Sequence, residues 1–223
     1  MKKLINILFI LISISLYSQT KLDSLIVDEI NYQRSLLNIC PVKYEFDSSL
    51  YIPVRNHSKY MNIFRIVSHE QSKGDTIING DTIKAIYSTN ERYKKYLEKN
   101  RKYCIGENVT TETTSRNISL DSLEKFLVKK LVFMFMNECD NRYGIKPHRE
   151  SLMNINSDKC CVSVDIIEIE KTGKLRKMGE NDEVITIDKT YRYYMASITV
   201  VMVDKYPPEI IIEKSKMMKN LTN

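Results

Sequence analysis

The chain has 223 residues, and its 43% hydrophobic and 28% charged residues lie close to the averages of globular proteins. This composition excludes a collagen-like, a low-complexity disordered and a polytopic membrane protein, because the sequence has one long apolar run, near the N-terminus. The formal net charge of +6 is modest, and one compact domain is the default for this length.

Residues 1–18 have the pattern of a secretory signal peptide. Two lysines precede an apolar run from Leu4 to Leu16, and a serine then leads into a polar stretch. The run is shorter than the roughly 20 apolar residues of a membrane span, so cleavage is favoured over anchoring. Removal of the leader lowers the net charge to +4. We therefore expect a secreted or periplasmic protein without a membrane span in the mature chain, with a domain over 19–206 and a tail over 207–223.

Export would place the five cysteines in an oxidising compartment, where disulfides persist. Structural disulfides are the favoured state, and buried free thiols and a cysteine metal site are the alternatives. The odd number leaves at least one thiol outside any intrachain pair, and no Cys-x-x-Cys motif is present. Two adjacent cysteines would face opposite sides of a strand. The five are Cys40, Cys104, Cys139, Cys160 and Cys161.

The first part of the mature chain predicts two helices. Apolar residues recur at three- and four-residue steps over 21–39, and Pro41 closes this helix. Asp47 resembles a helix cap, and helical spacing continues to Phe64. Pro53 is unusual in this position: either the regular helix begins at Pro53, or its first turn is kinked.

The middle of the chain is polar. An Asn-Gly pair predicts a tight hairpin between 76–78 and 82–86. The basic, tyrosine-containing stretch 91–101 predicts a surface helix with a solvated face. Tyrosines interleaved with lysines can also bind nucleic acid, but an exported chain of modest charge predicts no nucleic-acid partner.

The last part predicts a helix over 121–137 and then strands. The strands fall at 161–169, 184–187 and 193–203, and a charged turn with two glycines occupies 171–182. Helices followed by strands favour the α+β class, with helices covering a sheet.

Three histidines and two acids are the candidate site residues. His57 lies within the second predicted helix, where a packing or capping role is favoured, whereas His69 and His148 lie on loops. Glu107 and Glu138 could join them around a divalent ion, because imidazole favours zinc or copper and carboxylate favours calcium or magnesium. The zinc-protease and nucleophile-elbow motifs are absent, so motifs do not support catalysis.

The order of several short motifs resembles the CAP superfamily, which includes cysteine-rich secretory proteins and bacterial SCP-like domains. The resemblance extends from about Leu22 to Val203. The motifs are Asn31-x-x-Arg34, Tyr44-x-x-Asp47-x-x-Leu50, Ser68-His69, Gly106-Glu107-Asn108, Phe135-x-x-Glu138 and Pro147-His148-Arg149-x-x-Leu152-Met153. Two positions depart from the family pattern: Phe135 stands where tryptophan is typical, and Pro147 where glycine precedes the second histidine.

This resemblance implies a three-layer α-β-α sandwich with a central antiparallel sheet and a cavity lined by two histidines and two acids. Carried over by motif, these are His69, His148, Glu107 and Glu138. They form the predicted metal site, with zinc as the first candidate and magnesium or calcium as alternatives. A purely structural polar cluster, with Glu107 accepting backbone donors in a turn, is the other interpretation.

The corresponding function is a secreted binding or effector module with an unidentified lipid, glycan or protein ligand. A metal-assisted hydrolase with Glu107 or Glu138 as general base is one alternative. A lipid or sterol carrier, using apolar residues such as Met134 and Phe135, is another. The sequence favours a non-enzymatic role.

Overall fold

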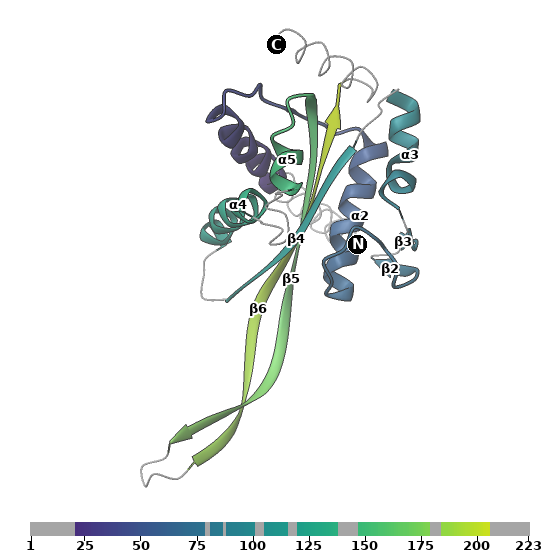
Figure 1. The fold of residues 1–223 in the computed structure, drawn as a ribbon. Helices are drawn as coiled ribbons and strands as arrows, with labels where there is room; N and C mark the ends of the chain where they lie inside the picture. The colour runs from purple at the N-terminus through teal and green to yellow at the C-terminus, as the bar shows by residue number, and fades with distance from the viewer. Residues whose placement is uncertain are drawn as a thin grey trace, which may run out of the picture.

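The computed structural model describes residues 21–78, 81–86, 88–100, 105–115, 120–137, 147–178 and 184–205. After a first helix over residues 21–35, the elements follow in the order shown in Figure 1. They are β1 (Lys43–Tyr44), α2 (Ser48–Phe64), β2 (Thr76–Ile78), β3 (Asp81–Ile83), α3 (Thr89–Asn100), β4 (Ile105–Ser115), α4 (Leu120–Asn137), α5 (Pro147–Leu152), β5 (Ser157–Met178) and β6 (Val184–Asp204).

The main sheet has four strands in the order β1-β5-β6-β4. Strand β6 pairs antiparallel with both β5 and β4, whereas β1 pairs parallel with β5. The predicted all-antiparallel sheet is therefore wrong in this one pairing, and the sheet is mixed. Strands β2 and β3 form a separate hairpin, as the Asn-Gly pair predicts.

Helices cover both faces of the main sheet (Figure 1). The first helix, α4 and α5 pack on one face, in a core that includes Ile26, Leu127 and Val162. On the other face α2 and α3 pack through a smaller core that includes Leu50 and Tyr93. The structure thus confirms the predicted three-layer α-β-α sandwich.

Helix α2 begins earlier than Pro53. The side chain of Asp47 accepts a hydrogen bond from the backbone N–H of Ser49 at 2.8 Å, which satisfies one of the free donors of the first turn. Pro53 then lies inside the helix, so a start at Pro53 is wrong. The cap fixes the start, and the helix tolerates the one hydrogen bond that proline cannot donate.

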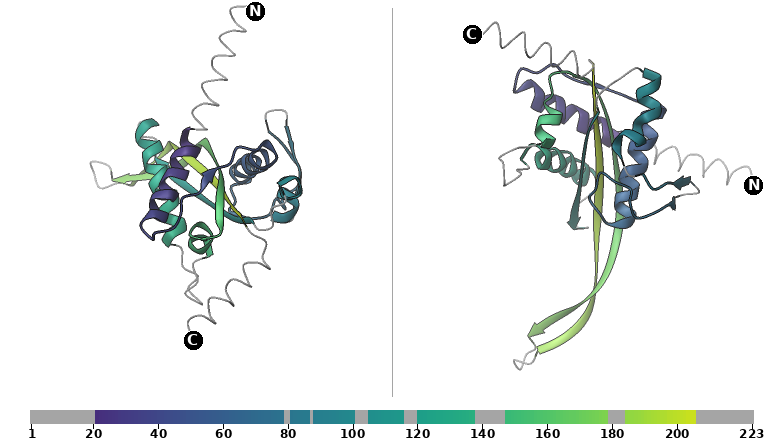
Figure 2. Two further views of the ribbon diagram at one scale, coloured as in Figure 1. Left: turned by 90° about the horizontal axis from the view of Figure 1, so that it is seen from above. Right: turned by 45° about the vertical axis from the view of Figure 1, so that its right-hand side comes forward.

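Strands β5 and β6 are much longer than predicted. Their register is continuous from Lys159 paired with Val203 to Met178 paired with Val184. Strand β4 ends at Ser115, opposite Tyr193 of β6. From Tyr193 towards Val184, β6 pairs with β5 alone, and the two strands form a ribbon that extends away from the rest of the domain (Figures 1 and 2). The expected charged turn over 171–182 is therefore wrong over 171–178, where β5 continues in antiparallel pairing with 184–191 of β6.

The three described cysteines, Cys40, Cys160 and Cys161, are free. Cys160 and Cys161 are buried in the cores on opposite faces of the sheet, as expected of neighbours on a strand. The favoured disulfide state is therefore wrong for these three residues, because burial on opposite faces separates the two neighbours. Cys104 and Cys139 lie outside the described residues.

Arg34 joins the first helix to the start of β5. Its side chain is completely buried, and within the described ranges its hydrogen bonds go to backbone carbonyls and to no acid. The four acceptors are the carbonyl oxygens of Cys40, Leu152, Asn154 and Ser157, at 2.7–3.3 Å. One side chain thus satisfies backbone carbonyls of the segment after the first helix and of the link from α5 to the start of β5.

Asp23 is a buried carboxyl between the first helix and the sheet. It accepts hydrogen bonds from the backbone N–H of Val164 at 2.9 Å and from the hydroxyl of Tyr51 at 3.2 Å. Burial disfavours the charged form and raises the pKa of Asp23 to about 7.

We expect the Asp23→Asn variant to lose a specific part of the pH dependence of stability. Between about pH 4 and pH 7 the folded state keeps a proton on Asp23 that the unfolded state releases, so this residue lowers stability as the pH rises. The slope for one proton is at most about 1.4 kcal/mol per pH unit. Urea titrations of both proteins at pH 4.5 and 7.5 would test this, and an unchanged difference between the two pH values would contradict it.

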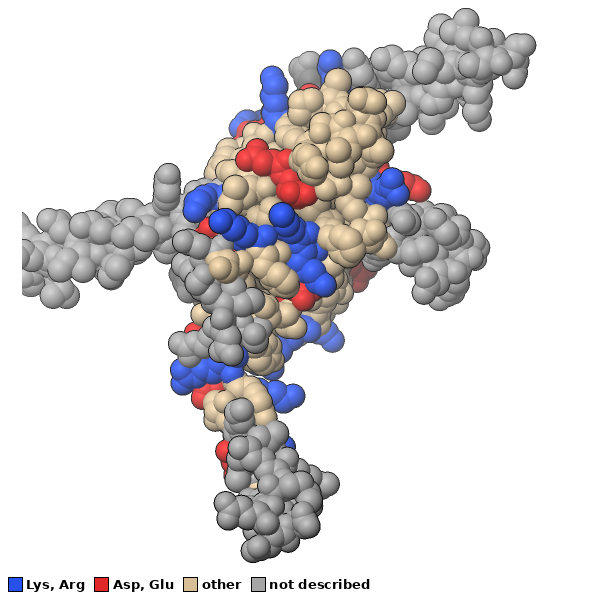
Figure 3. All heavy atoms as spheres, turned by 90° about the vertical axis from the view of Figure 1, so that its left-hand side faces the viewer, with Lys and Arg blue, Asp and Glu red and all other residues tan. Residues whose placement is uncertain are grey.

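Charged side chains of both signs are interspersed on the face that carries the first helix and α4 (Figure 3). Uncharged surface lies between them, so this face has no continuous field of one sign. None of the helices in the described part of the chain combines the length and apolarity needed to cross a membrane.

Candidate functional site

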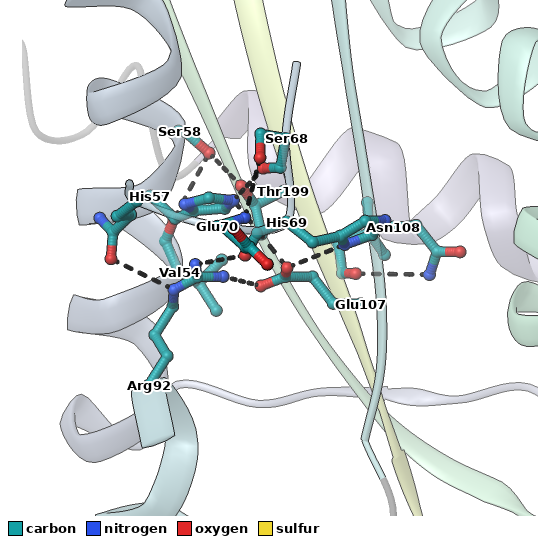
Figure 4. Close-up of polar contacts among 12 residues, drawn as sticks. Val54, His57, Ser58, Ser68, His69, Glu70, Arg92, Glu107, Asn108 and Thr199 are labelled. Carbon is teal, nitrogen blue, oxygen red and sulfur yellow. Dashed lines mark hydrogen bonds and ion pairs between the residues drawn. The ribbon is translucent and has the colours of Figure 1, made fainter. Parts of the chain in front are cut away.

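Glu107 forms the centre of a buried polar network on β4 (Figure 4). Its side chain is 1% exposed and accepts hydrogen bonds from Arg92 Nη1 and the Tyr93 hydroxyl, both on α3, and from His69 Nδ1 at 3.1 Å. Burial raises the pKa of Glu107, but the His69 hydrogen bond and the charge of Arg92 outweigh this effect and lower the pKa to about 2. Glu107 is therefore an ionised, fully engaged carboxylate rather than a free ligand.

This network fixes the orientation of His69 and shows which ring nitrogen donates to Glu107. An ionised carboxylate can only accept, so His69 Nδ1 carries the hydrogen and the other ring nitrogen, Nε2, keeps its lone pair in the neutral ring. Arg92 Nη2 also donates to the His69 carbonyl oxygen at 2.6 Å and so holds the backbone of the same residue. The side chain of His69 is 49% exposed, and its Nε2 can bind a ligand.

His57, on α2, lies beside the same network, with its Nε2 3.9 Å from Glu107 Oε1. Its Nε2 donates to the Ser68 carbonyl oxygen at 2.9 Å, and its ring is completely buried. Burial, and then the charge of Arg92, lower the pKa of His57 to about 4, so the ring is neutral at pH 7. The predicted packing role fits this position: His57, in the middle of α2, ties this helix to the loop that carries His69.

His148 approaches His69 from the opposite layer. It lies in α5, a short helix, and not on the loop predicted from the sequence. Helix α5 packs closely on β4, because Gly106 leaves room for Ser151 where any Cβ would clash with its hydroxyl oxygen. The ring centroids of His69 and His148 are 6.1 Å apart, and Phe135 packs edge-on against His148 at 5.3 Å.

The side chains of His69 and His148 line a cavity of about 530 Å³. Apolar side chains dominate its walls, and they come from the loop after α2, from β4 and from α4. The lining residues are Val67, Ser68, His69, Val109, Thr110, Phe133, Met134, Phe135, Asn137 and His148. The cavity is large enough for a short peptide segment or a small ligand.

The structure therefore brings together three of the four predicted site residues: His69, Glu107 and His148. The fourth, Glu138, lies outside the described residues. Glu107 sits on a strand and not in a turn, and its donors are side chains rather than the expected backbone groups. Within the described ranges, no three His, Cys, Asp or Glu side chains form a group that could hold a metal ion.

Sequence reasoning missed Arg92 and Tyr93. Both lie in the basic stretch that predicted a solvated helix, yet Arg92, Tyr93 and Tyr96 are buried while Lys94 and Lys95 are exposed. The expectation of a merely solvated face is wrong for the buried side of α3. The step of three residues from Tyr93 to Tyr96 was the available signal, because it places two aromatic rings on one side of a helix.

Motifs that are far apart in the sequence thus meet in the arrangement that the resemblance implies, within an α-β-α sandwich. The fold resembles that of CAP and SCP-like domains. No family model matches the sequence, and no curated protein matches it at a significant level.

The solved structures similar to this chain include the following two. One is a cysteine-rich secretory protein from Staphylococcus aureus, at 13% identity and a TM-score of 0.39, covering 84% of this chain and 39% of the other. The second is an extracellular protein containing an SCP domain from Bacillus anthracis, at 15% identity and a TM-score of 0.41, covering 84% of this chain and 41% of the other. This chain therefore spans about two fifths of the length of each.

Proposed function

We propose that this protein is an exported binding module whose His69–His148 pair holds a divalent ion, with zinc as the first candidate. The observation that carries the proposal is the neighbouring pair of imidazoles, with ring centroids 6.1 Å apart, in the lining of one cavity. The leader pattern of residues 1–18 and the extracellular SCP protein among the similar structures support export.

The residues present fit a metal ion in two respects. First, Glu107 binds His69 Nδ1 and leaves Nε2 with its lone pair, which is how a carboxylate commonly orients a metal-binding imidazole. Second, the ring of His148 lies beside that of His69, with centroids 6.1 Å apart, and both rings line one cavity. Neutral imidazoles favour zinc over magnesium or calcium. The ion would supply a Lewis-acidic centre in the cavity.

The hydrolase alternative loses support at Glu107. A general base needs a pKa near the working pH and an oxygen free to take a proton. The pKa of Glu107 is lowered to about 2, and both oxygens already accept hydrogen bonds. Glu107 therefore acts as a positioning residue for His69.

Titration calorimetry tests the metal site. We expect the purified protein to bind zinc saturably and the His69→Ala/His148→Ala variant to lose this binding, because both predicted ligands are removed. His69 is half exposed and His148 is partly buried, so the variant keeps most of the core.

A matched control is Glu70→Gln, which removes an exposed carboxylate next to His69 and should leave the heats unchanged. Magnesium and calcium titrations on the same proteins give the metal preference. Equal zinc heats for the native protein and the double variant would overturn the proposal.

A further inference from the structure

The outer ribbon, formed by residues 171–178 of β5 and 184–191 of β6, has two unlike faces (Figure 2). In an antiparallel pair, residues directly opposite each other belong to the same face, and successive residues belong to opposite faces. The register therefore assigns each residue of the ribbon to one face. The pair Lys171–Tyr191 belongs to the first face, and the pair Thr172–Thr190 belongs to the second.

The first face, named here the basic face, combines lysines with apolar residues. Its eight positions hold three lysines, four apolar or aromatic residues, one glycine and no acid. Lys171 is exposed, and Tyr191 is 40% exposed. The opposite pairs are Lys171 with Tyr191, Gly173 with Lys189, Leu175 with Ile187, and Lys177 with Ile185.

The second face, named here the polar face, provides partners for its own polar groups. The hydroxyls of Thr172 and Thr190 are 3.5 Å apart, and Lys174 lies opposite Asp188 in the register. Closer to the domain, the same face carries the ion pair of Arg192 with Glu170, at 3.0 Å. One pair on this face is apolar, Met178 with Val184 at the outer end. The two faces thus differ in charge and in apolar content.

The basic face is too small for a stable contact with another protein. Six steps of about 3.3 Å make it about 20 Å long, and two strands about 4.8 Å apart make it about 10 Å wide. A standard protein interface covers about 800 Å² on each partner, and lysine is depleted there. A soluble polyanion would pair with the lysines but not with the apolar residues between them.

A bilayer that contains anionic lipids fits both components of this face. Lysine near such a surface strengthens binding about fivefold per residue, because the headgroups are negatively charged. Apolar side chains of a surface-bound element enter the boundary between headgroups and acyl chains. Tyrosine favours the level of the headgroups, where its ring is in apolar and its hydroxyl in polar surroundings.

We propose that this chain binds the surface of a bilayer containing anionic lipids through the basic face of the outer ribbon. The link 179–183 contains three acids and lies outside the described residues, so only the paired strands are assigned to this surface. No residue of the His69–His148 pair takes part. The lipid surface and the metal site are therefore independent, and either can fail without the other.

Cosedimentation of the full protein with lipid vesicles tests the proposal. We expect binding to vesicles of phosphatidylcholine with phosphatidylglycerol, little binding to phosphatidylcholine alone, and weaker binding at higher salt. Lys171→Gln/Lys177→Gln removes two charges from the basic face and should lower the partition coefficient about tenfold or more. The matched control Lys174→Gln/Arg176→Gln removes two charges from the polar face of the same strand. It should lower the coefficient less than about threefold.

A fluorescent probe on each face gives a second test. The chain has no tryptophan, so Tyr191→Trp places a single indole on the basic face and Thr190→Trp places one on the polar face. Vesicles with phosphatidylglycerol should shift the emission of the first variant to shorter wavelength and leave that of the second unchanged.

Four outcomes would overturn the proposal. They are no binding to the anionic vesicles, equal losses from the two double variants, equal emission shifts at the two positions, and a shift of the Tyr191→Trp variant that grows with protein concentration when no vesicles are present. The last outcome would mean that a second copy of the chain, and not a lipid surface, covers the basic face.

Discussion

Replacement of Arg34 by methionine is expected to lower the free energy of unfolding by about 3–5 kcal/mol. Methionine fills much of the same volume but leaves four backbone carbonyls without their donor. Each buried acceptor without a partner costs about 1–3 kcal/mol, partly recovered where water can enter. Arg34→Lys should recover little of the loss, because one ammonium group cannot reach all four carbonyls at once.

Urea denaturation followed by tyrosine fluorescence measures this change. The control is Arg192→Met, which removes an exposed arginine whose ion pair with Glu170 joins side chains that are each about half exposed. Such pairs contribute about 0–1 kcal/mol, so this variant should stay close to the native protein. A loss at Arg34 no larger than that at Arg192 would contradict the structural role of the buried guanidinium.

Replacement of Arg92 by methionine should also cost about 3–5 kcal/mol, because it leaves the buried charge of Glu107 without its principal partner. The Arg92→Met/Glu107→Gln variant should be less destabilised than the sum of its two single changes. Removing both charges avoids an unpaired ion, and a neutral amide can still accept from Tyr93. Urea denaturation of the four proteins gives the coupling free energy.

Lys94 provides the matched control on the same helix. Its side chain is 71% exposed and pairs only weakly with Glu98, at 3.8 Å, so Lys94→Met should change stability by less than about 0.5 kcal/mol. Strict additivity of the Arg92 and Glu107 changes would mean that the two groups do not interact, and would refute the network described for the site.

The sequence predicted the helices well because their signals are local. The three- and four-residue spacing over 21–39 and 121–137 matches helices over 21–35 and Leu120–Asn137. The cap at Asp47 was also recognisable, since its hydrogen bond joins residues two apart. Such features depend on neighbours along the chain, which the sequence lists directly.

The strands were less predictable, because pairing partners are distant in the chain. Strand β4 was not predicted: its polar residues do not alternate with apolar ones, and its stability comes from β6, about ninety residues later. The outer part of β5 was assigned to a turn, whereas 184–187 in β6 was predicted as a short strand, and the pairing of the two along the whole ribbon was not predicted.

The candidate site was predictable through motifs and not through composition. His69, Glu107 and His148 were identified by their resemblance to family motifs, and the structure joins His69 to Glu107 and sets His148 beside them. Arg92 and Tyr93 carry no motif, and their role depends on the depth at which α3 packs. Only three-dimensional packing decides which residue of a charged run is buried.

The two central strands of the sheet, β5 and β6, are encoded last among the described elements, and the helices made earlier pack on them. A ribosome delivers the chain from its N-terminus, so neither core can close until residues up to about 204 have emerged. The helices that are synthesised earlier therefore lack the sheet on which they pack until β5 and β6 have emerged.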